Sequence, residues 1–113
     1  MVKNYIPKQG DIVYFDFNPT KGHEQKGNRP AIIVSINIFN EKTKMVMACP
    51  ITSNTKDFPT HYLLEDTKKI KGSVLCEHIR SIDYDARRVS FVEKASENDL
   101  ISVLMLINAC LEQ

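Results

Sequence analysis

The sequence predicts a small, mainly β protein in which five to seven short strands wrap into a barrel and a single helix follows at the C-terminus. Three observations predict this fold. The 113 residues leave room for one domain, which we place at 1–113. Short runs of β-branched and aromatic residues, separated by turn residues, fill most of the chain. Only the last segment places apolar residues at helical spacing.

The first three strands are expected where such runs are longest. Residues 11–17 form the first run and end at the Asn-Pro turn signal at 18–19. Residues 31–38 and 45–51 form the next two, with Asn37 beginning the turn between them. Shorter runs then predict further strands at 61–64, 73–82 and 88–92.

The C-terminal segment 97–111 is expected to form a helix. Ser96 and Asp99 have the spacing of an N-terminal cap, and apolar residues recur from Leu100 to Leu111 at helical intervals. Apolar residues also occupy the intervening positions, so the helix needs cover on more than one side. Burial against the sheet and a share in a dimer interface both remain open.

Composition favours a cytoplasmic protein without a membrane span. The N-terminus carries no apolar stretch of signal-peptide length, and no apolar run is long enough to cross a bilayer. Cys49, Cys76 and Cys110 are odd in number and lie among apolar neighbours, which is typical of buried, reduced thiols.

Positive charge is concentrated in the first part of the chain. Residues 1–44 hold seven Lys or Arg against four Asp or Glu, whereas 45–113 hold eight against ten. A basic face suited to a polyanion and an ordinary solvated surface both explain this asymmetry. The long connection 18–30 carries much of the charge, and long loops of this kind are commonly functional.

Two sequence features stand out together. The first is Gly22-His23-Glu24-Gln25-Lys26-Gly27-Asn28-Arg29-Pro30, and the second is the later Pro50-Ile51-Thr52-Ser53. On these two features the chain resembles the MazF/PemK toxins of bacterial toxin–antitoxin modules. The similarity extends over roughly residues 5–111 and includes Ile79-Arg80-Ser81-Ile82-Asp83. It implies an SH3-like, CcdB/PemK-like barrel with a C-terminal helix that works as a homodimer.

The resemblance also implies an activity. Members of the family are metal-independent, cofactor-free endoribonucleases that cut single-stranded RNA, usually mRNA, within a short recognition sequence and so inhibit translation and growth. The 2′-hydroxyl attacks the adjacent phosphate, leaving a 2′,3′-cyclic phosphate and a 5′-hydroxyl. The implied partner is a MazE-like antitoxin whose acidic C-terminal segment covers the RNA site, and no membrane is involved.

Arg29, Thr52 and Glu24 are the expected catalytic residues. Arg29 offers a planar, permanent charge suited to clamping a phosphate, although a surface or salt-bridging role is the alternative. The Thr52 hydroxyl is placed to orient a phosphate oxygen, but it would serve equally to satisfy turn backbone. Glu24 is the candidate proton acceptor or an orienter of Arg29.

Further residues are expected to bind the RNA by base stacking, by hydrogen bonds to base edges, or by contacts with phosphates. At positions 23 and 78 many relatives carry Ser and Gln, whereas this chain has two imidazoles that can bind a base or move a proton. Separate segments hold its histidines, so no metal site is expected. The expected RNA-binding residues are Phe17, Thr20, Lys21, His23, Lys26, Ser53, Lys56, Phe58 and His78.

Two other functions fit the same fold. A CcdB-like gyrase poison uses this barrel without RNA chemistry, but it has no need of a phosphate-clamping pair such as Arg29 and Thr52. A non-catalytic SH3-like binding module is the second alternative. The absence of Trp and an aromatic content of only 8% disfavour a groove for proline-rich peptides.

Overall fold

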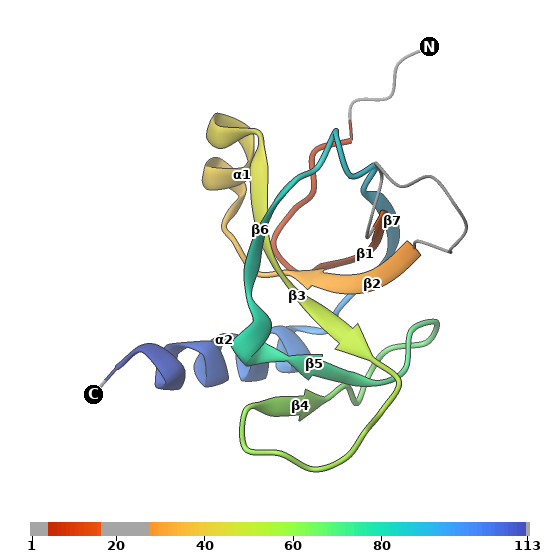
Figure 1. The fold of residues 1–113 in the computed structure, drawn as a ribbon, viewed down its shortest axis with the longest axis vertical. Helices are drawn as coiled ribbons and strands as arrows, with labels where there is room; N and C mark the ends of the chain where they lie inside the picture. Colours follow the sequence, from red (N-terminus) through yellow and green to blue (C-terminus); the bar gives the residue numbers. More distant parts are fainter. Residues whose placement is uncertain (1–4, 17–27, 113) are drawn as a thin grey trace.

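The computed structural model describes residues 5–16 and 28–112. Within these ranges the strands and helices follow one another along the chain as shown in Figure 1. They are β1 (Asp11–Asp16), β2 (Asn28–Ile33), α1 (Asn37–Thr43), β3 (Met45–Thr52), β4 (His61–Leu63), β5 (Ser73–Leu75), the 3₁₀ turn η1 (Cys76–His78), β6 (Arg80–Asp83), β7 (Ser90–Lys94) and α2 (Glu97–Leu111).

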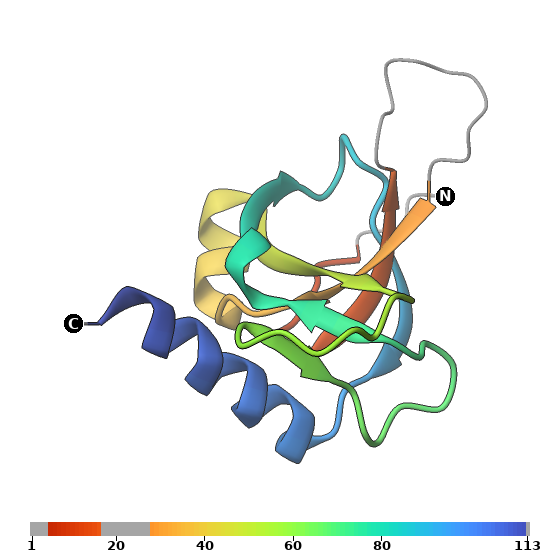
Figure 2. The ribbon, with the colours of Figure 1, turned by 60° about the horizontal axis from the view of Figure 1, so that its bottom comes forward.

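The strands form one curled antiparallel sheet of seven strands. Its order is β4-β5-β3-β2-β1-β7, and β6 pairs with β3 beside β5. Figures 1 and 2 show how strongly the sheet bends round, with α2 running along one side of it. The expected small SH3-like barrel with a C-terminal helix is therefore confirmed, although among the described residues the two end strands β4 and β7 do not pair to close it.

Two apolar clusters occupy the two faces of the sheet. Along β2 the side chains alternate, so that Ile32 joins one cluster while Ala31 and Ile33 join the other. The Ile32 cluster is covered by Val103 and Ile107 of α2. The other cluster lies on the opposite face of β2 and includes Phe15.

The predicted helix is confirmed with the same bounds, because its N-terminal cap is real. The Ser96 hydroxyl accepts the backbone N–H of Asp99 at 3.0 Å. The helix leaves Met105 and Leu111 largely exposed. Within the described ranges, no helix is both long and apolar enough to span a membrane.

Two of the expected strands are wrong in extent. The second ends at Ile33 and is followed by α1, where a continuation of the strand to 38 and then a turn were expected. Asn40, fully buried in this helix, donates to the carbonyl of Pro7 and so ties α1 to the N-terminal segment. The expected strand 73–82 is interrupted by η1, which separates β5 from β6 along the same edge of β3.

The cysteines are free, but only two of them are buried. Cys49 and Cys76 lie in the core, and burial raises the pKa of each thiol to about 12, which keeps both protonated. Cys110 is exposed near the end of α2, so the expectation of three buried thiols is wrong at this position. Apolar neighbours in the sequence do not show which face of the helix Cys110 occupies, and that face is exposed.

Candidate functional site

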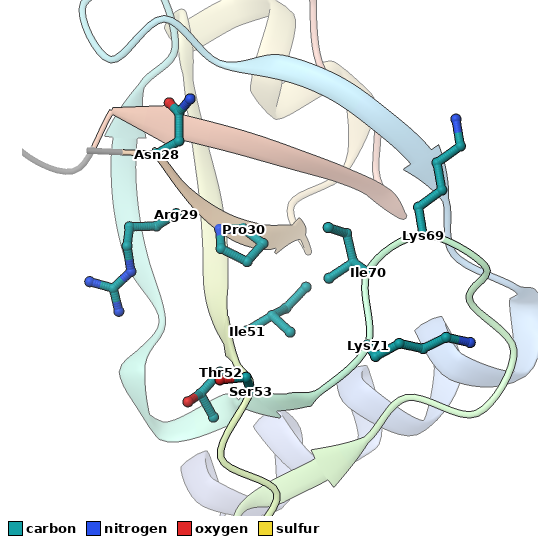
Figure 3. A pocket seen from close by; sticks show the side chains of 9 residues that line it. All are labelled: Asn28, Arg29, Pro30, Ile51, Thr52, Ser53, Lys69, Ile70 and Lys71. Carbon is teal, nitrogen blue, oxygen red and sulfur yellow. The ribbon is translucent and has the colours of Figure 1, made fainter. Parts of the chain in front are cut away.

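A pocket of about 310 Å³ lies where β2 begins and β3 ends. We call it the Arg29 pocket. Figure 3 shows Pro30, Ile51 and Ile70 between two polar walls. Arg29 and Thr52 stand on one side, and two lysines stand on the other. The complete lining is Asn28, Arg29, Pro30, Ile51, Thr52, Ser53, Lys69, Ile70 and Lys71.

Arg29 is positioned by strand pairing. It lies opposite Phe15 of β1, and the next residue, Pro30, restricts the backbone at the pocket edge. Along β2, Arg29 lies two residues before Ala31 and so shares its face, the one that carries the cluster with Phe15. Its exposed side chain therefore extends that face beyond the end of the apolar core.

Pairing between β2 and β3 brings the second predicted catalytic residue to the same face. Ala31 lies opposite Pro50, and continuing this register by two residues sets Arg29 opposite Thr52. Residues opposite one another in an antiparallel pair project from the same face. Two residues far apart in the sequence thus meet in one pocket because of the fold.

The Thr52 hydroxyl also has a local role. Its oxygen accepts the backbone N–H of Asn54 at 3.1 Å, which fixes the turn after β3. Accepting this bond leaves the hydroxyl hydrogen free to donate. The structural and the functional interpretations of Thr52 are therefore compatible, because the oxygen accepts the Asn54 N–H while the hydroxyl hydrogen remains available to donate.

Lys69 and Lys71 are pocket residues that the sequence analysis did not single out. The sequence holds a lysine-rich stretch, Lys68, Lys69 and Lys71, between the expected strands 61–64 and 73–82, and this pattern by itself predicts only a connection. Pairing of Thr52 with Ser73 brings the end of this connection beside the catalytic candidates. Asn28 was missed for a similar reason, since a single amide carries no pattern.

The predicted RNA-binding residues after β3 are distributed around the pocket. Ser53 lines it, whereas Lys56 and Phe58 lie on the exposed loop beyond. The Phe58 side chain is 52% exposed, and its ring lies against His61 with centroids 4.9 Å apart. An exposed ring outside the core suits a platform for a base.

His78 belongs to a separate polar cluster around Glu77. The Nε2 atoms of His61 and His78 lie 3.1 and 3.5 Å from the Glu77 carboxylate, which also accepts the Thr60 hydroxyl at 2.7 Å. Burial alone would raise the pKa of Glu77, but the hydrogen bonds from Thr60, its own backbone and His61 lower it below the usual value. His78 is not among the residues that line the Arg29 pocket.

Several predicted residues lie outside the described ranges. They share one segment, whose flanking residues Asp16 and Asn28 pair with each other beside Arg29. They are Phe17, Thr20, Lys21, His23, Glu24 and Lys26. In residues 5–16 and 28–112, no group of three or more His, Cys, Asp or Glu is arranged to hold a metal ion.

Comparison with known proteins places this geometry in a family. Residues 8–111 match the family described as PemK-like, MazF-like toxin of type II toxin-antitoxin system. The chain is 39% identical over 87 residues to the endoribonuclease toxin MazF of Escherichia coli K12, covering 77% of this chain and 78% of that protein. It is 32% identical to the endoribonuclease toxin ChpB of the same strain, over 99% of this chain and the whole of ChpB.

Solved structures agree with the sequence relatives. A MazE–MazF crystal structure from Deinococcus radiodurans superposes with a TM-score of 0.85 at 30% identity, covering 97% of this chain and 99% of the other. MazF alone from the same organism gives a TM-score of 0.82 at 35% identity, covering 96% and 98%. The likeness therefore extends over nearly the entire fold.

Proposed function

The chain belongs to the PemK-like, MazF-like toxin family of type II toxin–antitoxin systems. From this premise we propose that it is an endoribonuclease toxin that cuts single-stranded RNA at a phosphate bound in the Arg29 pocket. The observation that carries the proposal is the convergence of Arg29 and Thr52 on one face of β2 and β3.

The proposed reaction is an internal transfer of the phosphoryl group. The 2′-oxygen forms a bond to the adjacent phosphorus while the bond from phosphorus to the 5′-oxygen breaks. The 2′-hydroxyl loses its proton to a base and the 5′-oxygen gains one, giving a 2′,3′-cyclic phosphate and a 5′-hydroxyl. No water enters this step, so atoms and charge balance between substrate and products.

Each side chain has one task in this proposal. The Arg29 guanidinium binds the non-bridging phosphate oxygens and stabilises the negative charge that develops on them. The Thr52 hydroxyl donates to one of these oxygens while its own oxygen remains fixed by Asn54. Glu24, outside the described residues, is the proposed proton acceptor.

We propose that the reaction requires no metal ion. A metal would stabilise the negative charge that develops on the phosphoryl oxygens, and in this proposal the Arg29 guanidinium stabilises that charge instead. A guanidinium fixed on a strand stabilises negative charge on phosphoryl oxygens through charge-assisted hydrogen bonds.

Flanking nucleotides bind outside the Arg29 pocket in this proposal. Phe58 supplies a ring for stacking, and His78 supplies a hydrogen-bonding edge next to Glu77. Lys56 and Ser53 lie on the loop between the pocket and Phe58 and contact the RNA backbone. The remaining contacts are assigned to Phe17, Thr20, Lys21, His23 and Lys26.

The partner protein is an antitoxin of the MazE kind, as in the complexes of the structural relatives. We propose that its acidic C-terminal segment covers the Arg29 pocket and excludes RNA, because a chain of carboxylates imitates a chain of phosphates. We also propose a homodimer, in which the apolar side chains that α2 leaves exposed are covered by a second copy.

The two alternative functions are not supported. The relatives that match over most of this chain are endoribonucleases, which speaks against a gyrase poison and against a non-catalytic SH3-like module.

The test is incubation of the purified protein with a defined single-stranded RNA in EDTA. Discrete cuts with 2′,3′-cyclic phosphate ends are expected. Cleavage that appears only after a divalent cation is added would contradict the proposed chemistry.

A further inference from the structure

The loop between β4 and β5, residues 64–72, forms the wall of the Arg29 pocket that faces Arg29 and Thr52. Lys69, Ile70 and Lys71 of this loop line the pocket. In Figure 3 the two lysine side chains extend from the loop on the side away from Arg29. Both are exposed, so the pocket has cationic residues on two walls.

A carboxylate of β7 holds this loop in place. The two oxygens of Glu93 accept the backbone N–H groups of Lys68 at 3.0 Å, Lys69 at 2.9 Å and Ile70 at 2.8 Å. Burial would raise the pKa of Glu93, but these three hydrogen bonds and the charge of Lys69 lower it. Glu93 is therefore ionised at neutral pH and committed to the loop backbone.

A second carboxylate, from α2, holds the beginning of the loop. Asp99 is fully buried and accepts the backbone N–H groups of Glu65 at 3.2 Å and Asp66 at 3.0 Å. Asp66 in turn accepts the hydroxyl of Ser96 at 2.7 Å. The Asp66 side chain is thus bound at the N-terminus of α2, near the beginning of the loop, whereas Lys69 and Lys71 lie near the end of the loop.

The last residue of the loop fixes its distance from the catalytic candidates. Gly72 packs so closely that a Cβ atom there would lie 2.2 Å from the backbone oxygen of Thr52. The lysines therefore belong to a backbone that is anchored on β7, on α2 and on Thr52 itself.

The lysine side chains have donors to offer. The ammonium of Lys71 donates to the carbonyl of Thr67 at 2.7 Å, which leaves two of its three N–H groups available. The backbone N–H of Lys69 donates to Glu93, so the position from which the Lys69 side chain extends is fixed. The Glu93 carboxylate also interacts electrostatically with Lys69, but its oxygens already accept backbone N–H groups of the loop.

We propose that Lys69 and Lys71 form a second phosphate-binding site, which holds the RNA phosphate next to the one bound by Arg29. This inference rests on the proposed function and extends it. Arg29 and Thr52 act on the phosphate that reacts, and the loop 64–72, which we call the lysine loop, binds the adjacent phosphate of the RNA. The loop is a positioning element for the substrate, and Glu93 positions the loop.

The test measures binding of a single-stranded RNA that carries one 2′-deoxyribose 5′ of the cut, so that it is bound without being cleaved. Its Kd is measured across a series of salt concentrations for the unaltered protein and for the double variant Lys69→Ala/Lys71→Ala. Loss of the site is expected to raise Kd roughly tenfold. The slope of log Kd against log salt should fall by about 0.7, the value for one phosphate contact on a single strand.

Lys68→Ala is the matched control. Lys68 belongs to the same loop and carries the same charge, but it does not line the pocket. We expect it to leave Kd within about twofold of the unaltered protein and the salt slope unchanged. Cleavage of the all-ribose RNA by the double variant should show the loss in KM more than in kcat, as expected for a contact outside the reacting centre.

The outcomes separate the two proposals. If the double variant and Lys68→Ala have the same Kd and the same slope, the lysine loop is not a phosphate site, although the protein still cuts RNA. If the double variant binds RNA normally but binds an acidic antitoxin peptide more weakly, the loop serves the antitoxin and our assignment is wrong. If the unaltered protein neither binds nor cuts RNA, the proposed function fails and this inference fails with it.

Discussion

Gly72 is packed against the backbone oxygen of Thr52 so tightly that no side chain fits between them. The φ angle of Gly72 is +146°, a backbone conformation that other residues rarely adopt. The contact joins the lysine loop to the end of β3, and hence to the Arg29 pocket. Because both strain and overlap would oppose a Cβ atom, this position provides a sensitive probe of the site.

Gly72→Ala should destabilise the fold and impair RNA binding together. The overlap is with backbone rather than with a flexible side chain, so we expect a loss of about 2 kcal/mol or more in the free energy of unfolding. Gly10→Ala is the control, because Gly10 also has a positive φ but its Cβ would meet only the Leu100 side chain at 3.2 Å. Denaturant unfolding and RNA titration of both variants check this, and a Gly72→Ala protein that is as stable as the unaltered one would refute the contact.

Arg29→Ala should reduce RNA cleavage by at least about 100-fold with little change in stability. The side chain is exposed beyond the core, so its removal leaves no cavity. Arg29→Lys should recover only part of the activity, because an ammonium lacks the planar pair of donors. Lys42→Ala in α1, which also removes one positive charge, serves as the control and should cut RNA normally. Near-full activity of Arg29→Ala would show that Arg29 is structural.

Glu93→Gln should cost stability at neutral pH and progressively less in acid. The folded-state pKa of Glu93 lies below its ordinary value of 4.5, so the ionised form stabilises the fold above that pH. As the pH falls through the folded-state pKa, the carboxyl takes up a proton and the advantage over glutamine disappears. Chemical denaturation of both proteins at pH 7 and near pH 3 measures this difference, and a gap that widens in acid would contradict the role of Glu93.

The exposed face of α2 should mediate self-association. Ile101, Met105 and Leu111 are 48%, 67% and 76% exposed and line one apolar groove. Light scattering at micromolar concentration should give about twice 12.9 kDa for the unaltered chain. Ile101→Lys/Met105→Lys should reduce the mass to that of one chain, whereas Phe91→Lys, which alters an equally exposed apolar side chain on β7, should not. Equal effects of the two changes would argue against α2 as the interface.

The elements that the sequence predicts best are those whose signals are local. The bounds of α2 are correct because the Ser96 cap and the apolar spacing lie within the helix itself. At the start of α1 the sequence predicts strand because Ile36 and Ile38 continue an apolar run, yet both side chains are exposed, at 54% and 58%. Its buried residue Asn40 donates a hydrogen bond to the carbonyl of Pro7, which is distant in sequence, and so anchors the helix through a contact that the local pattern does not contain.

In the candidate site, too, local motifs were predictable from the sequence and contacts between distant residues were not. Arg29 and Thr52 were found through a family motif, but the physical reason for their meeting is the pairing of β2 with β3. Lys69 and Lys71 carry no motif, and their place at the pocket follows from Glu93, Asp99 and Gly72, which act over long separations in the chain. Contacts of this kind cannot be inferred from spacing alone.

The most direct test of the central claim uses two RNAs that differ by a single oxygen. One is all ribose, and the other has a 2′-deoxyribose immediately 5′ of the cut. In EDTA the protein should cut the first to give a 2′,3′-cyclic phosphate and should leave the second intact at that position, because the attacking hydroxyl is missing. Cutting of both RNAs at the same bond would contradict attack by the 2′-hydroxyl and the role assigned to the Arg29 pocket.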